Sequence, residues 1–96
     1  MYRMSTAYPD KVTDIDVLEI KSAKYIGNYS IHILFNDGLA KIVYFIYFLT
    51  HSQHLSIRKY LDENRFSQFS IVDGNLNWND YELIFPLEDL YEKEQI

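Results

Sequence analysis

Hydrophobic and polar residues alternate in the first half of the chain, and this alternation predicts an antiparallel sheet. Leu18 and Ile20 are apolar whereas their neighbours are charged, which indicates a strand with one face exposed to solvent. Gly27-Asn28 is typical of a turn and leads into "NYSIHILFNDGLAKIVYFI", where two apolar segments flank an Asp-Gly pair. The pattern therefore predicts three consecutive strands.

Asp37-Gly38 predicts the loop between the second and third strands. Both central positions of a type I′ turn need a positive φ, which favours a two-residue loop here. In the resulting register the paired residues share one apolar face: Phe35 with Ala40, Ile33 with Ile42, Ile31 with Tyr44, and Tyr29 with Ile46. A slip of one residue would set Ile33 against Lys41 and mix the two faces, so the pattern favours the first register.

The middle of the chain predicts a loop and two short helices. "THSQHLS" is polar and indicates the loop. Ser56 can cap the first helix and Asp62 the second, because both side chains accept hydrogen bonds from free N–H groups at a helix start. The inward-facing residues would be Ile57, Tyr60 and Leu61 in the first helix, and Phe66 and Phe69 in the second.

The last third predicts a hairpin and a terminal helix. "FSIVDGNLNW" has strand character around a turn at Asp73-Gly74 or at Gly74-Asn75, and the pattern does not select between the two registers. Trp78 is expected to lie in the core of this hairpin, and "YELIF" predicts a last strand. Pro86 suits the first turn of a helix. Its inward stripe would consist of Leu87, Leu90 and Tyr91.

This order of elements predicts an α+β fold. An antiparallel sheet of three N-terminal strands is followed by two short helices, two or three short C-terminal strands and a C-terminal helix. Residues 15–96 would form this single domain. Residues 1–14 show no periodicity, and we expect them to be a mobile N-terminal arm.

Composition and charge indicate the cellular compartment of the protein and the kinds of partner that it can bind. Among 96 residues there is no cysteine, no stretch resembling a signal peptide, and no apolar run longer than eight residues, so we expect a cytoplasmic protein that does not cross a membrane. The net charge of −5 is uneven. Residues 1–60 carry seven basic and five acidic side chains, net +2, whereas residues 61–96 carry two and nine, net −7. A basic footprint for a phosphate backbone is missing, so direct nucleic-acid binding is not expected.

An ordered set of short motifs resembles a known family. "VLEI", "ILFNDG", "VDGNLNW" and a closing "P…LY" are similar to the family called domain of unknown function 2442, which comprises small, mostly bacterial domains. The residues that carry the resemblance are Val17, Phe35, Asp37, Gly38, Leu61, Phe66, Asp73, Trp78, Pro86, Leu90 and Tyr91. Two positions depart from the family pattern. Asn79 stands where a proline is usual, and an aromatic segment follows Tyr44 where the family often has an acidic residue and a polar loop.

The resemblance implies an α+β fold and no established activity. Some relatives carry an appended helix-turn-helix, which implies a sensing or interaction module. Others lie beside a second small protein in two-gene arrangements of suspected toxin–antitoxin type. The chain shows no helix-turn-helix after this region, so we do not expect a DNA-binding role to carry over.

Candidate catalytic and metal-binding residues lack the partners that such sites need. His51 and His54 form an H-x-x-H pair without a third and fourth donor, and we interpret them as solvated loop histidines. His32 is interpreted as a hydrogen-bonded or half-exposed histidine of the sheet. Four carboxylates lie close together in the sequence: Asp80, Glu82, Glu88 and Asp89. Their spacing would suit a catalytic acid–base pair, but it is explained equally well by the preference of acidic residues for helix starts and strand edges. We therefore predict no catalytic residue, no metal and no cofactor.

The apolar run at residues 42–49 predicts a protein-binding surface. Eight consecutive apolar residues exceed what a half-exposed strand needs, so its second face should be covered. The candidate partner-binding residues are Phe45, Tyr47 and Phe48. Our first hypothesis is a non-enzymatic protein-interaction module, the regulatory or neutralising member of a two-protein system. One alternative is a homo-oligomeric structural domain, such as a homodimer that buries the other face of the predicted hairpin, where polar and apolar residues are mixed: Ser30, His32, Lys41, Val43 and Phe45. The other is a small-ligand binder or enzyme that uses Trp78 and nearby carboxylates.

Overall fold

The computed structural model describes residues 17–96, so the expected arm at residues 1–14 lies outside the described residues. In chain order the elements are β1 (Ile20–Gly27), β2 (Ser30–Phe35), β3 (Ala40–Tyr44), α1 (Ile46–His51), α2 (Leu55–Arg58), the 3₁₀ helix η2 (Lys59–Leu61), α3 (Glu63–Phe66), β4 (Ser70–Val72), β5 (Asn75–Asn77) and α4 (Leu87–Glu92). The strands β1, β2 and β3 form an antiparallel sheet, and β4 pairs with β5 in a second one. The predicted α+β class is confirmed.

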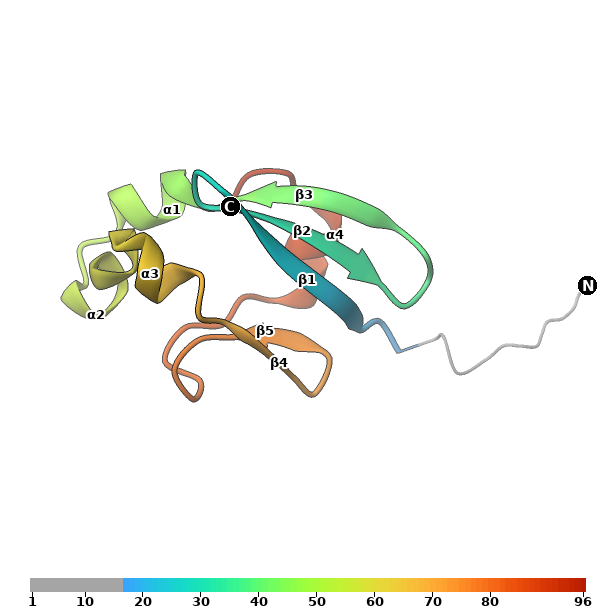
Figure 1. The fold of residues 1–96 in the computed structure, drawn as a ribbon. Helices are drawn as coiled ribbons and strands as arrows, with labels where there is room; N and C mark the ends of the chain where they lie inside the picture. Colours follow the sequence, from blue (N-terminus) through green and yellow to red (C-terminus); the bar gives the residue numbers. More distant parts are fainter. Residues whose placement is uncertain (1–16) are drawn as a thin grey trace, which may run out of the picture.

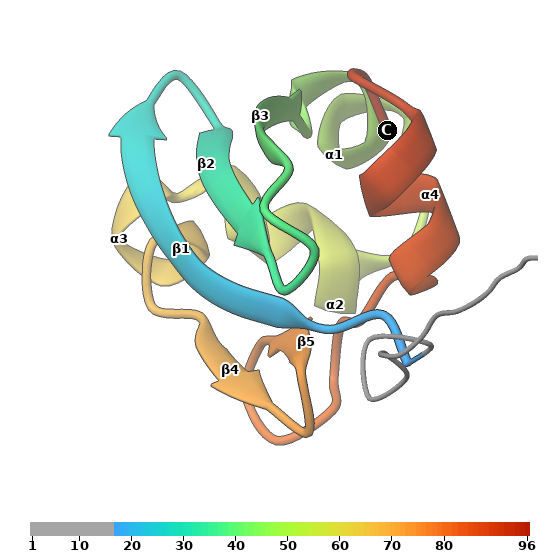
Figure 2. The same cartoon turned by 90° about the vertical axis from the view of Figure 1, so that its right-hand side faces the viewer.

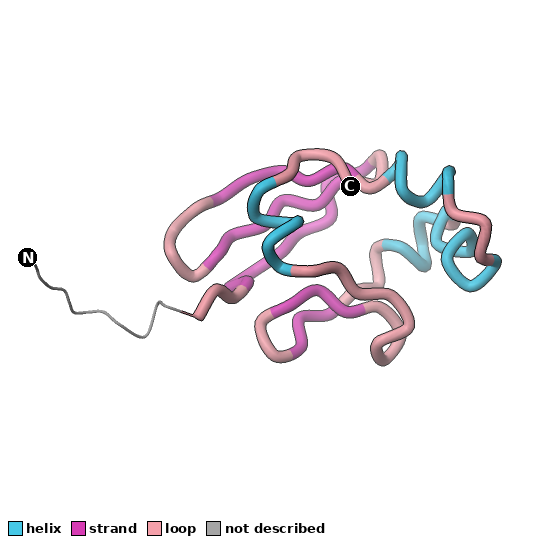
Figure 3. The backbone as a smooth tube through the Cα atoms, turned by 180° about the vertical axis from the view of Figure 1, so that it is seen from behind, coloured by secondary structure: helices cyan, strands magenta, loops and turns pink. Residues whose placement is uncertain are grey.

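The elements surround one core beneath the three-stranded sheet (Figure 1). The helices α1, α2 and α3 lie together at one end of the sheet, and the β4–β5 hairpin lies across from it. Seen from behind, α4 runs beside both sheets (Figure 3). Figure 2 shows the start of β1 reaching the β4–β5 hairpin, where the N–H of Ile20 donates a hydrogen bond of 2.7 Å to the Gly74 carbonyl.

The register of the β2–β3 hairpin differs from the prediction by one residue. Ile33 pairs with Lys41, the slip that the apolar pattern disfavoured, and the loop has three residues, 36–38. Gly38 has a φ of +96°, and its N–H donates to the Phe35 carbonyl at 3.0 Å, as in a turn that closes with a left-handed glycine. The predicted two-residue loop is therefore wrong.

Two tertiary contacts explain why the disfavoured register forms. Asn36 lies in the loop, where its side chain accepts from the Glu19 N–H at 3.1 Å and donates to the Val17 carbonyl at 2.7 Å. Lys41 extends its ammonium group to the carbonyls of Tyr91 and Lys93, at 2.7 and 2.8 Å. A lysine on the core-facing side is tolerated because it satisfies the free carbonyls at the end of α4.

The new register changes which aromatic residues are buried. Val43 and Phe45 belong to the core, whereas Tyr44, predicted to be a core residue, is 44% exposed. The strand also ends at Tyr44, and residues 46–51 form α1. Phe45 and Leu49 both lie fully buried at helical spacing. The apolar run thus satisfies a helical period as well as an extended one, which is the usual ambiguity of short apolar segments.

The second half of the chain agrees with most, but not all, of the predicted turns and caps. Asp62 caps α3, and its side chain accepts from the Asn64 N–H at 3.0 Å, as predicted. The N-cap of α2 is His54, so the predicted capping role of Ser56 is wrong. Pro86 immediately precedes α4 as its N-cap residue.

The β4–β5 hairpin uses the Asp73-Gly74 turn, with φ values of +51° and +79°. The predicted strand "YELIF" does not form. Instead, Asn79, Asp80 and Tyr81 adopt positive φ values between +50° and +70°, and one bridge between Trp78 and Leu83 closes this loop.

Candidate functional site

An apolar groove lies between α1 and α2 and has a volume of about 440 Å³. Tyr47 and Phe48 contribute from α1, Ile57 contributes from α2, and Ile96 closes one side. The Tyr47 ring is 50% exposed and stacks on the His51 ring at 3.9 Å. Phe48, Ile57 and Ile96 also pack against the hydrophobic core, so the groove is part of the folded domain.

The three predicted partner-binding residues divide between the surface and the core. Tyr47 and Phe48 both line the groove, and Phe48 also packs edge-on against Phe85 at 5.1 Å. Phe45 has no exposed surface, and its ring centroid lies 5.5 Å from that of Phe66 and 6.0 Å from that of Trp78. The expectation that Phe45 is an exposed ring is therefore wrong, because it followed from the incorrect strand register.

The rim of the groove is neutral to basic, although the chain is acidic overall. His51 and His54 line it, and Arg58 lies next to it, with its guanidinium directed to the Ser52 carbonyl at 3.4 Å. None of the side chains that line the groove is a carboxylate. Leu55, at the start of α2, is 83% exposed and extends the apolar character of this region.

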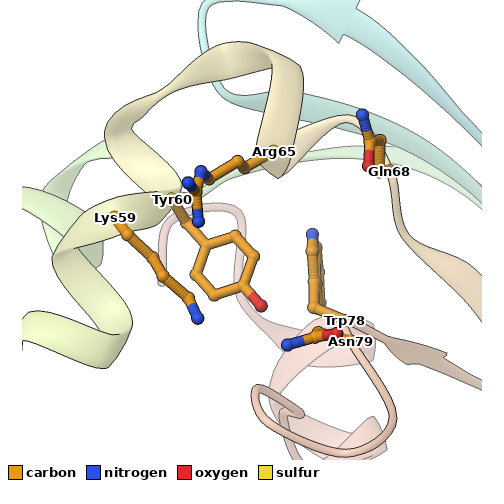
Figure 4. Close-up of a pocket in the computed structure, with 6 residues that line it drawn as sticks. All are labelled: Lys59, Tyr60, Arg65, Gln68, Trp78 and Asn79. Carbon is orange, nitrogen blue, oxygen red and sulfur yellow. The ribbon is translucent and has the colours of Figure 1, made fainter.

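A second, polar pocket of about 410 Å³ lies beside Trp78 (Figure 4). Figure 4 shows six side chains around one opening: Lys59, Tyr60, Arg65, Gln68, Trp78 and Asn79. The Trp78 ring itself has no exposed surface. It forms the wall behind the pocket, so the groups open to solvent are mainly nitrogen donors.

Glu82 connects the walls of the polar pocket. Its carboxylate accepts hydrogen bonds from the Lys59 ammonium at 2.7 Å, the Tyr60 hydroxyl at 2.6 Å and the Asn79 amide at 3.0 Å. These bonds, with that from Lys59 contributing most, lower the pKa of Glu82 to about 2. Burial, and then the bond to Glu82, raise the pKa of Tyr60 to about 12. With these pKa values Glu82 is ionised and Tyr60 is neutral near pH 7.

A family model described as "Protein of unknown function (DUF2442)" matches residues 20–95. The chain belongs to this family. No curated protein and no solved structure matches it. The family assignment confirms the resemblance noted in the sequence, and the match covers the described residues 17–96 except the first three and Ile96.

In this DUF2442 domain, residues that carried the resemblance meet in space. The hydroxyl of Tyr91 donates a hydrogen bond to the Asp37 carboxylate, which joins α4 to the tip of the β2–β3 hairpin. That bond lowers the pKa of Asp37 and raises the pKa of Tyr91. Trp78 and Leu90 are fully buried. These residues have structural roles that explain their place in the motif.

The carboxylates grouped in the sequence have different surroundings in the DUF2442 domain. Glu82 alone among them borders the polar pocket, through its bonds to Lys59 and Tyr60. Asp80 is exposed in the loop, and Asp89 lies in the first turn of α4, 3.5 Å from the Lys93 ammonium. The cationic residues of the pocket carried no sequence signal, because they lie in short helices 17 to 23 residues before Glu82.

The histidines lie on two different surfaces of the DUF2442 domain. His32 is exposed on the open face of the sheet, and His51 and His54 lie at the groove. Within residues 17–96, no three His, Cys, Asp or Glu side chains are placed to hold a metal ion together. In the same part of the chain, no helix has the length and apolar character needed to cross a membrane.

Proposed function

We propose that this DUF2442 domain is a non-enzymatic protein-interaction module that binds another protein through the groove between α1 and α2. The observation that carries the proposal is the half-exposed Tyr47, which stands over an apolar groove of about 440 Å³. Exposed tyrosines beside apolar pockets are typical of the residues that contribute most to protein–protein affinity.

The rim of the groove indicates the chemistry of the partner. Its polar groups are His51, His54 and the adjacent Arg58, and its lining contains no carboxylate side chain. An apolar side chain flanked by Asp or Glu would fill the groove and place its charges against this rim. The occupant is thus a short amphipathic segment with an apolar anchor and acidic flanks that face His51, His54 and Arg58.

The biological setting we propose is a two-protein system in which this domain is the regulatory or neutralising member. The resemblance to relatives in two-gene arrangements supports this setting. A small domain with a preformed groove suits the task, because binding would cost little conformational entropy on its side.

The test uses the purified product of the adjacent gene and isothermal titration calorimetry. Tyr47→Ser should weaken binding by about fivefold or more, since removing an aromatic side chain that contributes strongly to an interface costs over about 1 kcal/mol. Tyr44→Ser is the matched control, because Tyr44 is 44% exposed but lies on the sheet and not in the groove. Equal affinities of the wild type and Tyr47→Ser would refute the groove as the binding site. If the wild type does not bind the product of the adjacent gene, the proposed two-protein system is refuted.

A second candidate function is self-association through the open face of the sheet. Ile26 and Tyr44 are exposed on this face, with Lys24 and His32 beside them. Here the roles of the two variants reverse. Sedimentation should then show a dimer that Tyr44→Ser dissociates and Tyr47→Ser leaves intact, whereas a monomer at high concentration would exclude this function.

A further inference from the structure

The polar pocket beside Trp78 shares no lining residue with the α1–α2 groove, so it is a second and independent cavity. It is built from three segments: η2 supplies Lys59 and Tyr60, α3 and the residues after it supply Arg65 and Gln68, and the loop after β5 supplies Asn79. Its volume of about 410 Å³ is within the range of small-molecule sites.

Two donor groups at this pocket have unused hydrogen-bonding capacity. Within residues 17–96, the one ion pair of Arg65 runs from its Nε to the Asp62 carboxylate at 3.7 Å, and both side chains are more than half exposed. A pair at this distance and exposure is weak, because water screens it. Among the described residues, the terminal nitrogens of Arg65 and the amide of Gln68 donate no hydrogen bond.

The inner end of the pocket already stabilises an anion, namely the protein's own Glu82. Three donors from two segments, Lys59, Tyr60 and Asn79, converge on that carboxylate. The bonds hold Glu82 ionised at every physiological pH. Glu82 occupies these inner donors, so a bound ligand would be held by Arg65 and Gln68, which also line the pocket (Figure 4).

We propose that this pocket binds a small organic anion, whose carboxylate or phosphate is held by Arg65 and Gln68 beside Lys59, with the rest of the molecule against the Tyr60 ring. Arginine presents a planar fork of N–H groups that matches both kinds of oxyanion. The amide of Gln68 adds a neutral donor at the same opening. The proposal concerns a site that the protein-binding groove does not use, so it is independent of the proposed function.

The experiment is a titration followed by NMR, with the single Trp78 as the reporter. Trp78 is the one tryptophan in the sequence, so the resonance of its indole N–H, which donates to the Phe66 carbonyl, can be assigned without ambiguity. Citrate and inorganic phosphate are added in separate titrations, and sodium chloride of equal ionic strength is the reference. We expect a saturable shift of this resonance with citrate, phosphate or both, and none with chloride. Saturation by only one of them would identify whether the headgroup is a carboxylate or a phosphate.

Two charge variants separate specific binding from general attraction. Arg65→Gln should weaken the interaction by about tenfold, the loss expected for one charge-assisted hydrogen bond. Lys24→Gln removes the same charge from an exposed residue of β1, on the open face of the sheet, and should change nothing. Equal titrations of these two variants, or no saturable shift in the wild type, would overturn the proposal. Tyr47→Ser should titrate like the wild type, so a failure of this site is distinguishable from a failure of the groove.

Discussion

The indole N–H of Trp78 donates a hydrogen bond of 2.7 Å to the backbone carbonyl of Phe66, and the two rings stack with their centroids 5.5 Å apart. This relationship joins the end of α3 to the end of β5. It also satisfies a carbonyl of the last turn of α3, which has no partner within so short a helix. Phe45, Phe69 and Phe85 complete the cluster, with ring centroids within 6.0 Å of the Trp78 ring.

Trp78→Phe should destabilise the domain by about 2–4 kcal/mol, because it removes a buried donor and leaves a cavity beside the aromatic cluster. Chemical denaturation at neutral pH measures the loss. Tyr81→Phe is the matched control, since Tyr81 is exposed, and its change should stay within about 0.5 kcal/mol. Similar losses for both variants would contradict the central role of Trp78.

The register of the β2–β3 hairpin can be tested with two adjacent aromatic residues. Phe45→Ala should cost about 3–5 kcal/mol, because the whole ring is buried. Tyr44→Ala should cost about 1 kcal/mol or less, because its ring is half in solvent. In the register expected from the apolar pattern, Tyr44→Ala would be the more destabilising of the two. The variant that loses more free energy of unfolding relative to the wild type therefore identifies the register.

Lys41→Met tests why a lysine is tolerated on the core-facing side of the sheet. The substitution removes two hydrogen bonds to the last carbonyls of α4, and we expect a loss of about 1–3 kcal/mol and faster amide exchange in α4. Lys24→Met, on the open face, is the control and should leave both measurements close to the wild type. A more stable Lys41→Met protein would show that burying the ammonium is a net cost.

The stability of the domain should depend on the ionisation of Glu82. Its pKa is about 2 in the folded protein, below the ordinary value of 4.5, so the unfolded chain takes up a proton first as the pH falls. The stabilisation from Glu82 is therefore complete above about pH 4.5 and is lost as the pH approaches about 2. Urea midpoints of the wild type and Glu82→Gln, measured from pH 7 to pH 2, should differ at neutral pH and converge in acid. A constant difference would mean that the carboxylate charge contributes nothing.

Two glycines with similar backbone conformations should respond differently to alanine. Both have a positive φ, which costs an alanine about 1–2 kcal/mol. At Gly38 an added Cβ meets no atom within 4 Å, so the backbone cost is the whole effect. At Gly74 the added Cβ would lie 2.8 Å from Cβ of Glu19, so Gly74→Ala should be clearly the more destabilising in thermal unfolding. Equal melting temperatures would show that β1 can move away from this hairpin.

Short-range patterns correctly predicted the elements whose cause is local. The Asp62 cap needs only a side-chain acceptor two residues before a free N–H group. A turn at Gly74 was predicted from residues that tolerate a positive φ, and the structure selects Asp73-Gly74 from the two registers that the pattern allowed. The inward stripe of α4 follows from helical spacing, and Leu90 is fully buried. Of the residues that line the groove, Tyr47 and Phe48 were identified from the sequence, because they belong to an apolar run that is longer than one buried strand face needs.

The loop at residues 79–81 could not be predicted, because its backbone conformation is imposed from outside the segment. Three consecutive residues with positive φ are unfavourable by themselves, and Tyr81 especially so. The Asn77 side chain accepts from the Tyr81 N–H at 2.7 Å, and Glu82 is held by η2. For the same reason the polar pocket was missed, since its residues converge only when η2, α3 and this loop are packed together.

The sequence by itself determined the α+β class, the order of most elements and the burial of Trp78, because alternation, turn residues and caps act over a few residues. Only the tertiary structure decided the hairpin register and the fate of the apolar run. Lys41 could face inward because α4, some 50 residues later, offers it two carbonyls, and no local pattern contains that partner. Phe45 moved from the surface to the core with that one-residue shift, because successive side chains of a strand point to opposite faces.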